Sequence, residues 1–360
     1  MQALILAGGK AQGLRPLTIH TPKPIIPVAN RAFLFYQLEL FRRANLTDLT
    51  LSVNFPPGKI EDMFGNAAHH GVNLRYAQEA QPLGTAGALR QLMNERRALT
   101  VVLNGDILTN ASIASALAAH RELRAAVTIM TYAVEQPGQY GLVVADEEHR
   151  VQQFIEKPRP EQLKPEWGTH INTGIYVIEP HIAERIPAGV RYDFESQLFP
   201  ALIAAGEPVY ALPLDGYWLD LGTPQRYLQA HQDLLAGKVK KIQLERPPLP
   251  PWLGEGEAPR VDKASILDPT VTLKAGAEII NSVIGANCVI EEKARIENCV
   301  IWSSARVGAQ AQLRNSFIGK SALIGKGVTL DAAVLGDKSN ITDYSQCGVR
   351  SAECGVVSAK

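Results

Sequence analysis

The last third of the chain carries an aliphatic repeat with a period of 17 residues. Its members are separated by six, six and five residues, and this triplet recurs along Leu267, Leu273, Ile279, Ile284, Ile290, Ile296, Ile301, Val307, Leu313, Ile318, Ile324, Leu330, Leu335 and Ile341. The segments that begin at Asn281, Asn298 and Asn315 repeat at the same interval. A helix or a strand meander does not keep this register over four turns, whereas a three-sided β-solenoid stacks one aliphatic side chain per face in a continuous core. The repeat therefore predicts a solenoid of short strands.

Residues 1 to about 240 show a different pattern, in which short apolar runs alternate with amphipathic segments. Buried strands are predicted at Leu4–Ala7, Leu49–Val53, Thr100–Leu103 and Ala126–Ala133. Helices are predicted at Phe33–Arg43, Ala86–Arg96 and Ile113–His120. The alternation predicts a largely parallel α/β sheet with helices on both faces. Ligands of such sheets bind beyond the carboxyl ends of the strands.

A proline-rich segment separates the two patterns. Arg246-Pro247-Pro248-Leu249-Pro250-Pro251 cannot continue a helix or a central strand, because proline lacks the backbone donor that both require. We therefore expect domains at 1–243 and 261–360, joined by a linker at 244–260.

The charge balance argues against strongly electrostatic partners. The chain has 36 basic and 36 acidic residues, so its net charge indicates neither a nucleic acid nor a membrane surface. The segment Met1–Ala7 contains no basic residue and only a short apolar run, which is typical of a first strand and not of a signal peptide. We expect a soluble, cytoplasmic protein.

A glycine-rich segment follows the first predicted strand, at Gly8-Gly9-Lys10-Ala11-Gln12-Gly13-Leu14-Arg15-Pro16-Leu17-Thr18. A glycine turn after a strand lets backbone N–H groups approach a phosphate. The segment is not a Walker loop, because Leu14-Arg15 stand where Lys and Ser or Thr are needed, and its glycine spacing does not fit the dinucleotide pattern. Taken alone, the turn is as easily structural as functional.

Pro22-Lys23-Pro24 extends this turn into a longer signature. The whole stretch resembles the N-terminal signature of the sugar-1-phosphate nucleotidyltransferases, in which G-G-x-G-T-R-L-R-P-L-T precedes P-K-P. Further segments resemble that family's motifs in the same order, at Pro82-Leu83-Gly84-Thr85-Ala86-Gly87-Ala88, Asn104-Gly105-Asp106, Tyr140-Gly141, Phe154-Ile155-Glu156-Lys157-Pro158, Asn172-Thr173-Gly174-Ile175-Tyr176 and Trp218-Leu219-Asp220-Leu221-Gly222-Thr223-Pro224. Pairs such as Ile284-Gly285 and Ile318-Gly319 resemble the hexapeptide repeats of left-handed β-helices. The resemblance covers the entire chain and is closest to the mannose-1-phosphate guanylyltransferases.

This resemblance implies both a fold and a reaction. The fold is a Rossmann-like mixed α/β sheet flanked by helices, followed by a left-handed parallel β-helix. In the reaction, a sugar-1-phosphate oxygen attacks the α-phosphorus of a nucleoside triphosphate, releases pyrophosphate and forms a nucleoside diphosphate sugar. Because the attacking oxygen is already anionic, no general base is needed, and the protein supplies alignment and charge neutralisation. The implied partners are these two substrates and, through the β-helix, further copies of the chain.

The resemblance also implies roles for individual residues. Lys23, Arg15 and Asp106 would be catalytic, and Asp106 and Asp220 would hold Mg²⁺, a hard cation that prefers carboxylate and phosphate oxygens. The nucleotide would lie against Ala7, Gly8, Gly9, Glu79, Pro82, Gly84 and Thr85. The sugar phosphate would lie against Gly141, Glu156, Lys157 and Asn172. Taken singly, such residues have ordinary alternatives, since an Asp at a strand end is usually a turn residue and a Glu-Lys pair is usually a surface pair.

The signature departs from the family pattern where Ala11-Gln12-Gly13 replaces G-T-R. The missing arginine would bind the triphosphate, and Ala11 adds a β-carbon where glycine permits a positive φ. Lys10 and Arg15 remain nearby as partial substitutes. Three interpretations stay open: a slow enzyme, an enzyme that binds the triphosphate differently, or a catalytically silent subunit that binds sugar nucleotides. If Gly13 stands in for the arginine, we expect Gly13→Arg to raise activity and the full G-T-R restoration to raise it further.

Base specificity is predicted from Glu79. By the resemblance, Glu79 faces the edge of the base, where guanine presents two adjacent donors that one carboxylate can accept. We therefore expect GTP and mannose-1-phosphate as substrates, with a glucose-1-phosphate uridylyl- or thymidylyltransferase as the alternative. Acyl transfer, another activity of hexapeptide β-helices, is disfavoured because no histidine follows His231 to serve as a base. We expect the solenoid to serve for oligomerisation.

Overall fold

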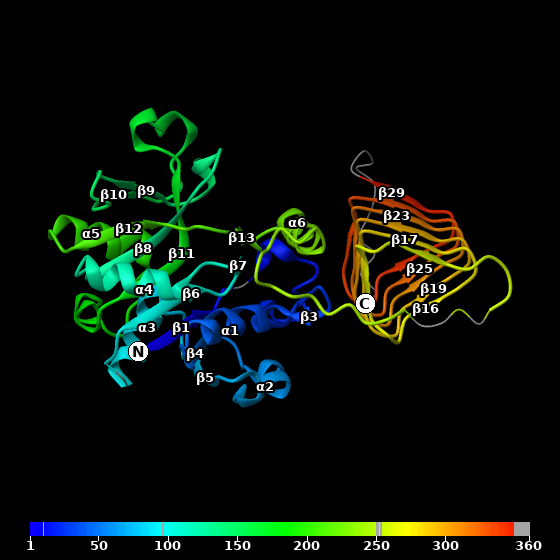
Figure 1. Cartoon of the computed structure of the whole chain (residues 1–360), viewed down its shortest axis with the longest axis horizontal. Coiled ribbons are helices and arrows are strands. Elements are labelled where there is room, and N and C mark those ends of the chain that lie inside the picture. The colour runs from blue at the N-terminus through cyan, green and yellow to red at the C-terminus, as the bar shows by residue number, and fades with distance from the viewer. Residues whose placement is uncertain (10, 96, 250–251, 253, 349–360) are drawn as a thin grey trace. The chain divides into compact units, whose positions relative to one another are not determined.

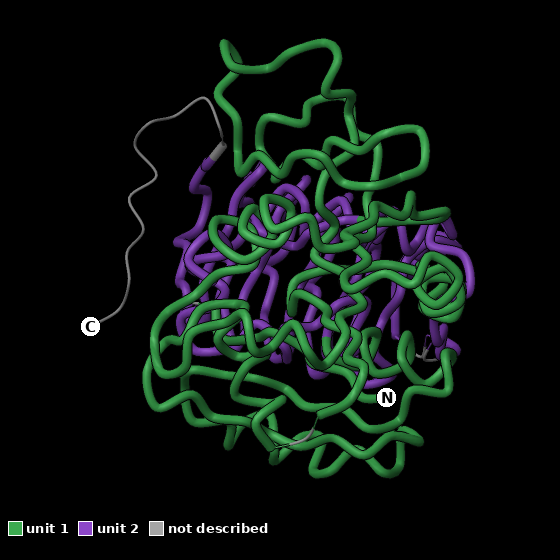
Figure 2. Tube along the Cα trace, turned by 90° about the vertical axis from the view of Figure 1, so that its left-hand side faces the viewer, with its two compact units in different colours: residues 1–10, 34–218 green, residues 11–33, 219–360 purple. Residues whose placement is uncertain are grey.

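The computed structural model describes residues 1–9, 11–95, 97–249, 252 and 254–348. Packing divides the chain into two compact units (Figure 2). Unit 1 contains residues 1–10 and 34–218, and unit 2 contains residues 11–33 and 219–360. The segment 11–33 thus belongs to unit 2, although unit 1 flanks it in the sequence.

Unit 1 is built on a nine-stranded sheet with the main order β10-β9-β11-β6-β1-β4-β5, which β8 joins through β11 and β12 through β8. The central strands β1, β4, β5 and β6 are parallel, whereas β11 runs antiparallel to β6. The sheet is therefore mixed, and the four strands predicted from the sequence are confirmed. Its strands are β1 (Gln2–Leu6), β4 (Asp48–Val53), β5 (Asn73–Gln78), β6 (Thr100–Asn104), β8 (Val127–Ala133), β9 (Leu142–Ala145), β10 (Val151–Ile155), β11 (His170–Ile178) and β12 (Val209–Pro213).

The α-helices between these strands cover the sheet with apolar faces. They are α1 (Phe33–Arg43), α2 (Gly58–Phe64), α3 (Gly84–Glu95), α4 (Ile113–Glu122) and α5 (Phe199–Ala204), so the three predicted helices are confirmed. The helix α3 buries Leu89 and Met93 in the same core as Leu4 of β1 and Val102 of β6. Burying a side chain of this size stabilises the fold by about 1.5–3 kcal/mol. The helix α4 begins after Ser112, whose hydroxyl accepts the Ser115 N–H.

Residues 260–348 of unit 2 form a solenoid of three parallel sheets, whose three-sided outline is visible in Figure 1. Equivalent residues on neighbouring coils are 17 apart, as in the pairing of Ile279 with Ile296 and of Ile296 with Leu313. The predicted period is confirmed. The first sheet contains β14 (Arg260–Val261), β17 (Glu278–Ile280), β20 (Arg295–Glu297), β23 (Gln312–Arg314), β26 (Thr329–Asp331) and β29 (Gln346–Gly348). The second contains β15 (Ile266–Leu267), β18 (Val283–Ile284), β21 (Val300–Ile301), β24 (Phe317–Ile318) and β27 (Val334–Leu335), and the third contains β16 (Thr272–Leu273), β19 (Val289–Ile290), β22 (Arg306–Val307), β25 (Leu323–Ile324) and β28 (Asn340–Ile341).

The repeating asparagines form one corner of three successive coils. Asn281, Asn298 and Asn315 all have a positive φ, a conformation that asparagine tolerates better than most residues. Their side chains also form a ladder, in which Asn281 Nδ2 donates to Asn298 Oδ1 at 2.7 Å. This geometry explains why the asparagine recurs with the aliphatic period.

The second sheet of the solenoid is apolar on its outer side as well. Ile266, Val283, Val300 and Phe317 point away from the solenoid core and are nevertheless at most 3% exposed. The helix α6 (Pro224–Leu235) covers this side, and the ring of its Tyr227 stacks on Phe317 with centroids 4.9 Å apart.

The segment 11–33 packs on the same sheet as α6. Asn30 Nδ2 donates to the carbonyl of Ile284 at 2.8 Å. The packing division at 218/219 therefore differs from the linker predicted at 244–260, of which positions 250, 251 and 253 lie outside the described residues. Between α6 and β14 the described residues form no helix or strand. Nor does any helix in the described part of the chain have both the length and the apolar character needed to cross a membrane.

Candidate active site

Several predicted site residues meet where the parallel strands of unit 1 end. Ala7 follows β1, and its N–H donates to the Ser52 carbonyl at 2.8 Å. A Cβ on Gly8 would lie 3.5 Å from Glu79 Oε1, which places Gly8 beside the residue that follows β5. After β6, the Gly105 N–H donates to the Leu6 carbonyl at 2.8 Å, and a Cβ there would lie only 2.5 Å from that oxygen. Because residue 105 is glycine, the chain can leave β6 in close contact with the end of β1, and Asp106 follows at this point.

The carboxylate of Glu79 is 8% exposed and held at both oxygens. Ser52 Oγ donates to Oε1 at 2.8 Å, and the Leu83 N–H donates to Oε2 at 2.9 Å. The second bond closes the turn that leads to Pro82, Gly84 and the start of α3. Glu79 therefore shapes the predicted base loop, whatever else it contacts.

That loop is tied to the segment that contains residues 192–195. Gly84 has φ +77°, and a Cβ there would lie 2.6 Å from Asp193 Oδ1, so both the conformation and the close approach require glycine. The Thr85 N–H donates to Asp193 Oδ1 at 3.1 Å, and the Phe194 N–H donates to Thr85 Oγ1 at 2.8 Å. The first turn of α3 is thereby fixed by side chains more than 100 residues away in the sequence.

A partly buried carboxyl group, Glu195, connects this loop to the predicted sugar strand. Thr85 Oγ1 donates to Glu195 Oε2 and Tyr176 Oη donates to Oε1, each at 3.2 Å. Asn172 Nδ2 in turn donates to Tyr176 Oη at 2.7 Å. Burial and, secondarily, the charge of Glu156 raise the pKa of Glu195. One hydrogen-bonded chain therefore joins Thr85 to Asn172, two residues predicted to contact different substrates.

Glu195 was not predicted from the sequence as a site residue. The segment Tyr192-Asp193-Phe194-Glu195 has no glycine turn and no period that sets its carboxylates apart from surface residues. A possible signal was the pair of apolar residues Phe194 and Leu198 around Glu195, both fully buried in the core.

The predicted sugar-phosphate residues lie next to one another. The Asn172 N–H donates to the Gly141 carbonyl at 2.7 Å, and a Cβ on Gly141 would lie 2.9 Å from Glu156 Oε2. Lys157 Nζ lies 3.4 Å from Glu156 Oε1, and the lysine side chain is 69% exposed. Trp218 packs on Tyr140 and donates to the Thr173 carbonyl at 2.9 Å, which fits the packing role considered for it. Gly141, Glu156, Lys157 and Asn172 thus form one polar patch.

The other predicted residues, Arg15, Lys23 and Asp220, belong to unit 2. Asp220 is the last residue of β13 (Trp218–Asp220), and Lys23 begins the short 3₁₀ helix η2 (Lys23–Ile25). Arg226 Nη1 donates to both Asp220 oxygens, at 2.8 and 2.6 Å, and the Gly222 N–H donates to Oδ1 at 3.0 Å. The shared binding of one cation by Asp106 and Asp220 stays a prediction, since the two residues lie in different units.

The altered signature loop lies against the segment that carries Asp220. Ala11 has φ 46° and ψ 35°, the left-handed conformation that the glycine of the family pattern would adopt freely. A Cβ on Gly13 would lie 2.2 Å from the Gly222 carbonyl oxygen, well inside van der Waals contact. This geometry argues against the expectation that Gly13→Arg alone raises activity, because any side chain at position 13 requires the backbone to move. Lys10 lies outside the described residues.

Oxygen donors suited to Mg²⁺ occur in both units. Among the described residues, no group of three or more His, Cys, Asp or Glu side chains could hold a metal ion. The carboxylates of Asp106 and Asp220 do have the oxygens that Mg²⁺ prefers, and Mg²⁺ usually completes its shell with phosphates and water. Beside Asp106, the side-chain oxygen of Asn104 is buried without a hydrogen-bond partner. Each unit thus offers oxygen donors of the kind that Mg²⁺ prefers, and their joint use stays a prediction.

Comparison with known families assigns this architecture. A family model described as Nucleotidyl transferase matches residues 2–237, which is more than half of the chain. The chain belongs to the nucleotidyl transferase family. A second model, described as EIF2B subunit epsilon LbH domain, matches residues 256–347, where LbH denotes a left-handed β-helix. The solenoid and the handedness implied by its hexapeptides agree with this match.

Relatives within the nucleotidyl transferase family have different named substrates. The chain is 33% identical to a UTP–glucose-1-phosphate uridylyltransferase of Synechocystis sp., over 81% of this chain and 80% of that protein. It is 36% identical to a mannose-1-phosphate guanylyltransferase of Mycobacterium tuberculosis, over 66% of this chain and 65% of that protein.

A solved structure supports the fold alone. A protein of Bacillus anthracis described as a candidate glucose-1-phosphate thymidylyltransferase superposes with a TM-score of 0.60 at 19% identity, over 68% of this chain and 98% of that chain. At this identity the similarity carries no argument about substrates.

Proposed function

We propose that the chain transfers a nucleoside monophosphate from a nucleoside triphosphate to a sugar-1-phosphate and releases pyrophosphate. The observation that carries this proposal is the partly buried chain of hydrogen bonds from Thr85 through Glu195 and Tyr176 to Asn172. It holds the start of α3 and the strand β11 in fixed relation, as a site that aligns two substrates requires. The names of the relatives in Synechocystis and Mycobacterium tuberculosis support the same reaction class.

The proposed mechanism depends on position and charge. Lys157 would neutralise the phosphate of the sugar-1-phosphate, and Glu156 would accept hydrogen bonds from sugar hydroxyl groups. Lys23 and Arg15 would neutralise the triphosphate as negative charge moves onto the leaving pyrophosphate. Asp106 and Asp220 would hold Mg²⁺, which when bound supplies further neutralisation of the phosphates. No residue is required to remove a proton, because the attacking phosphate oxygen is already ionised.

We further propose that GTP and mannose-1-phosphate are the preferred substrates. Each oxygen of the Glu79 carboxylate already accepts one hydrogen bond, from Ser52 or Leu83, and each has a second lone pair available for a base. Guanine N1–H and N2–H₂ are two adjacent donors that match this pair. The identity with a uridylyltransferase over 81% of the chain supports UTP and glucose-1-phosphate as the alternative.

A silent, sugar-nucleotide-binding subunit is a second candidate. The observation in its favour is the loop at Ala11-Gln12-Gly13, where Gly13 lies against the Gly222 carbonyl and leaves no room for an arginine side chain. Such a subunit would bind a nucleotide sugar without releasing pyrophosphate. In either case we propose that the solenoid joins copies of the chain.

The experiment that tests the proposal is a matrix of pyrophosphate-release assays. GTP, UTP, dTTP, ATP and CTP are each combined with mannose-, glucose- and N-acetylglucosamine-1-phosphate. Release with GTP and mannose-1-phosphate above all other pairs supports the full proposal. Release with UTP and glucose-1-phosphate instead supports the proposed reaction class but shows that Glu79 does not select guanine. Calorimetric binding of GDP-mannose without any release supports the silent subunit.

A further inference from the structure

A cavity lies at the opposite end of the central strands of the unit 1 sheet. It has a volume of about 420 Å³ and is lined by His120, Arg121, Arg124, Ala125, Ala126, Glu179, His181 and Pro208. Ile178, the last residue of β11, pairs with Thr100, the first residue of β6. Glu179 therefore lies at the end of the strands opposite to the end that carries Asn104 and Asp106. A cavity of this size accommodates a small organic molecule. Its position separates it from the proposed active site.

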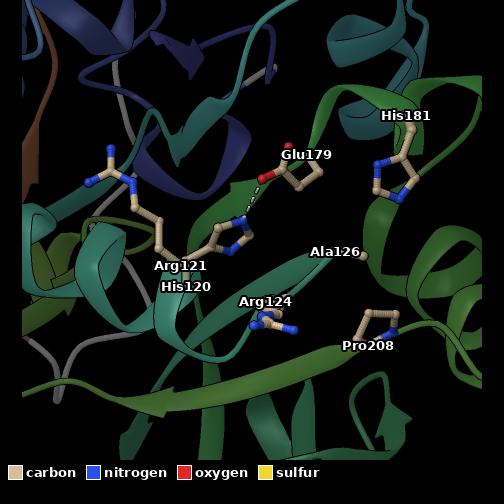
Figure 3. Close-up of a pocket in the computed structure, with 8 residues that line it drawn as sticks. His120, Arg121, Arg124, Ala126, Glu179, His181 and Pro208 are labelled. Atoms are coloured by element: carbon tan, nitrogen blue, oxygen red, sulfur yellow. Dashed lines mark ion pairs between the residues drawn. The ribbon is translucent and has the colours of Figure 1, made fainter.

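The side chain of His120 is 1% exposed and has one unused ring nitrogen. Nδ1 lies 2.8 Å from Thr128 Oγ1, whereas Nε2 has no hydrogen-bond partner. The nearest acceptor is Glu179 Oε1 at 3.5 Å, beyond the range of a well-formed hydrogen bond (Figure 3). Nε2 itself is buried, whereas the Glu179 side chain is 37% exposed, so the carboxylate is the acceptor that a ligand in the cavity can reach.

The remaining polar residues of the cavity are mostly basic. Arg121 and Arg124 lie at and just beyond the end of α4, and His181 comes from the 3₁₀ helix η7 (Pro180–Arg185). Glu179 is the single acidic residue among those that line the cavity. Arg121 contacts Met1 Sδ and in Figure 3 leads away from Glu179. Among the described residues, neither arginine is paired with a carboxylate, so the guanidinium of Arg124 is available to an anion.

We propose that this cavity binds a small organic phosphate that also carries hydroxyl groups, as a ligand distinct from the substrates. The phosphate would pair with Arg124, because a guanidinium matches phosphate geometry. A hydroxyl group of the ligand would donate to the Glu179 carboxylate, beside the buried ring of His120. The apolar wall of Ala126 and Pro208 would contact the carbon skeleton. The inference does not depend on which base or sugar the active site selects.

The test is calorimetric binding of two probes, glucose 6-phosphate and inorganic phosphate, to the full-length chain. The measurements use a Lys157→Ala background, which removes the contact proposed for the sugar phosphate in the active site. We expect saturable binding of about one glucose 6-phosphate per chain, weakened about tenfold or more by Arg124→Ala, the effect of losing one charge-assisted hydrogen bond. The exposed Arg42→Ala on α1 is the matched control and should leave the affinity unchanged.

The two probes separate the parts of the site. Glu179→Gln should weaken glucose 6-phosphate while leaving inorganic phosphate almost unchanged, because only the sugar presents a hydroxyl group at that distance from the phosphate. If Arg124 serves only to stabilise the end of α4, Arg124→Ala lowers the melting temperature without changing the affinity of either probe, and the proposal fails. Absence of saturable binding in the Lys157→Ala protein would equally overturn it.

Discussion

Arg226 donates from one nitrogen to both carboxylate oxygens of Asp220, at 2.8 and 2.6 Å. The pair is mostly shielded from solvent, with side chains 24% and 15% exposed. The carboxylate proposed to hold Mg²⁺ therefore already has a cationic partner. Mg²⁺ at Asp220 has to displace this guanidinium or share the carboxylate with it.

We predict from this pair that Arg226→Gln lowers the Mg²⁺ concentration required for half-maximal activity. A charge-assisted hydrogen bond contributes about 1.5–3 kcal/mol, so removing the competitor should lower that concentration about tenfold. Titration of Mn²⁺ binding by electron paramagnetic resonance gives a readout besides activity. Arg226→Lys, which keeps the charge, is the control and should stay near the wild type. A higher metal requirement in Arg226→Gln would show that Arg226 assists the metal site.

The Glu195 network predicts a strong effect of a change that preserves shape. Glu195→Gln replaces one acceptor oxygen with an NH₂ group, which then faces a donor hydroxyl of Tyr176 or Thr85. An unsatisfied buried group costs about 1–3 kcal/mol, so we expect kcat/KM to fall about 10- to 100-fold. Because Glu195 acts through Thr85 and Asn172, both the triphosphate and the sugar phosphate should show altered KM values. Glu61→Gln, at an exposed position on α2, is the control. Equal kinetic constants for the two variants would show that Glu195 does not position the substrates.

The same residue predicts a pH dependence of stability. Burial raises the pKa of Glu195 above its ordinary value of 4.5, so the native state binds this proton more tightly than the unfolded state. The contribution of Glu195 to the free energy of unfolding therefore decreases as pH rises from about 4.5 through the raised pKa. In Glu195→Gln this decrease should be absent. Urea unfolding of both proteins across this range checks it, and parallel pH profiles would contradict the assignment.

The signature loop predicts a difference between one substitution and three. Gly13→Arg alone should lower stability and activity, since its Cβ would lie 2.2 Å from the Gly222 oxygen. Replacing residues 11–13 together by Gly-Thr-Arg lets the backbone adopt another course, because glycine at 11 has more conformational freedom. We expect the triple variant to be at least as active as the parent. If the single variant alone is faster in pyrophosphate release, the loop conformation described for Gly13 is not the active one.

The solenoid predicts a contrast between its inner and outer positions. Ile301 is fully buried in the stacked coils, so Ile301→Asp buries an unpaired charge and should unfold this part of the chain. Leu323, on the outer side of β25, is 50% exposed, and Leu323→Asp should change stability by less than about 0.5 kcal/mol. Circular dichroism melting and sedimentation distinguish the two. A folded Ile301→Asp protein of unchanged assembly state would contradict the 17-residue register.

The features that the sequence predicted well are those that repeat or follow one another locally. The period of the solenoid and the alternation of strands and helices each follow from residues that are close to one another in the sequence. Glu195 could not be found this way, because its partners Thr85 and Tyr176 come from distant elements.

The division of the chain into two packing units has a related cause. It depends on the outer side chains Val283, Val300 and Phe317, which stand next to the inner aliphatics in each coil. Paired apolar residues on a short strand indicate a sheet covered on both faces, and this signal was present in the sequence.

The reaction proposed for this chain is nucleotidyl transfer to a sugar-1-phosphate. The most direct measurement is pyrophosphate release from GTP and mannose-1-phosphate by the wild type and by Asp106→Asn, with the nucleotide sugar quantified in parallel. We predict equal amounts of pyrophosphate and GDP-sugar from the wild type. Asp106→Asn should be slower by about 10²–10³-fold, the effect of losing one group that stabilises transition-state charge, with an unchanged melting temperature. Absence of release with every triphosphate and sugar-1-phosphate pair, or undiminished release by Asp106→Asn, would contradict the account.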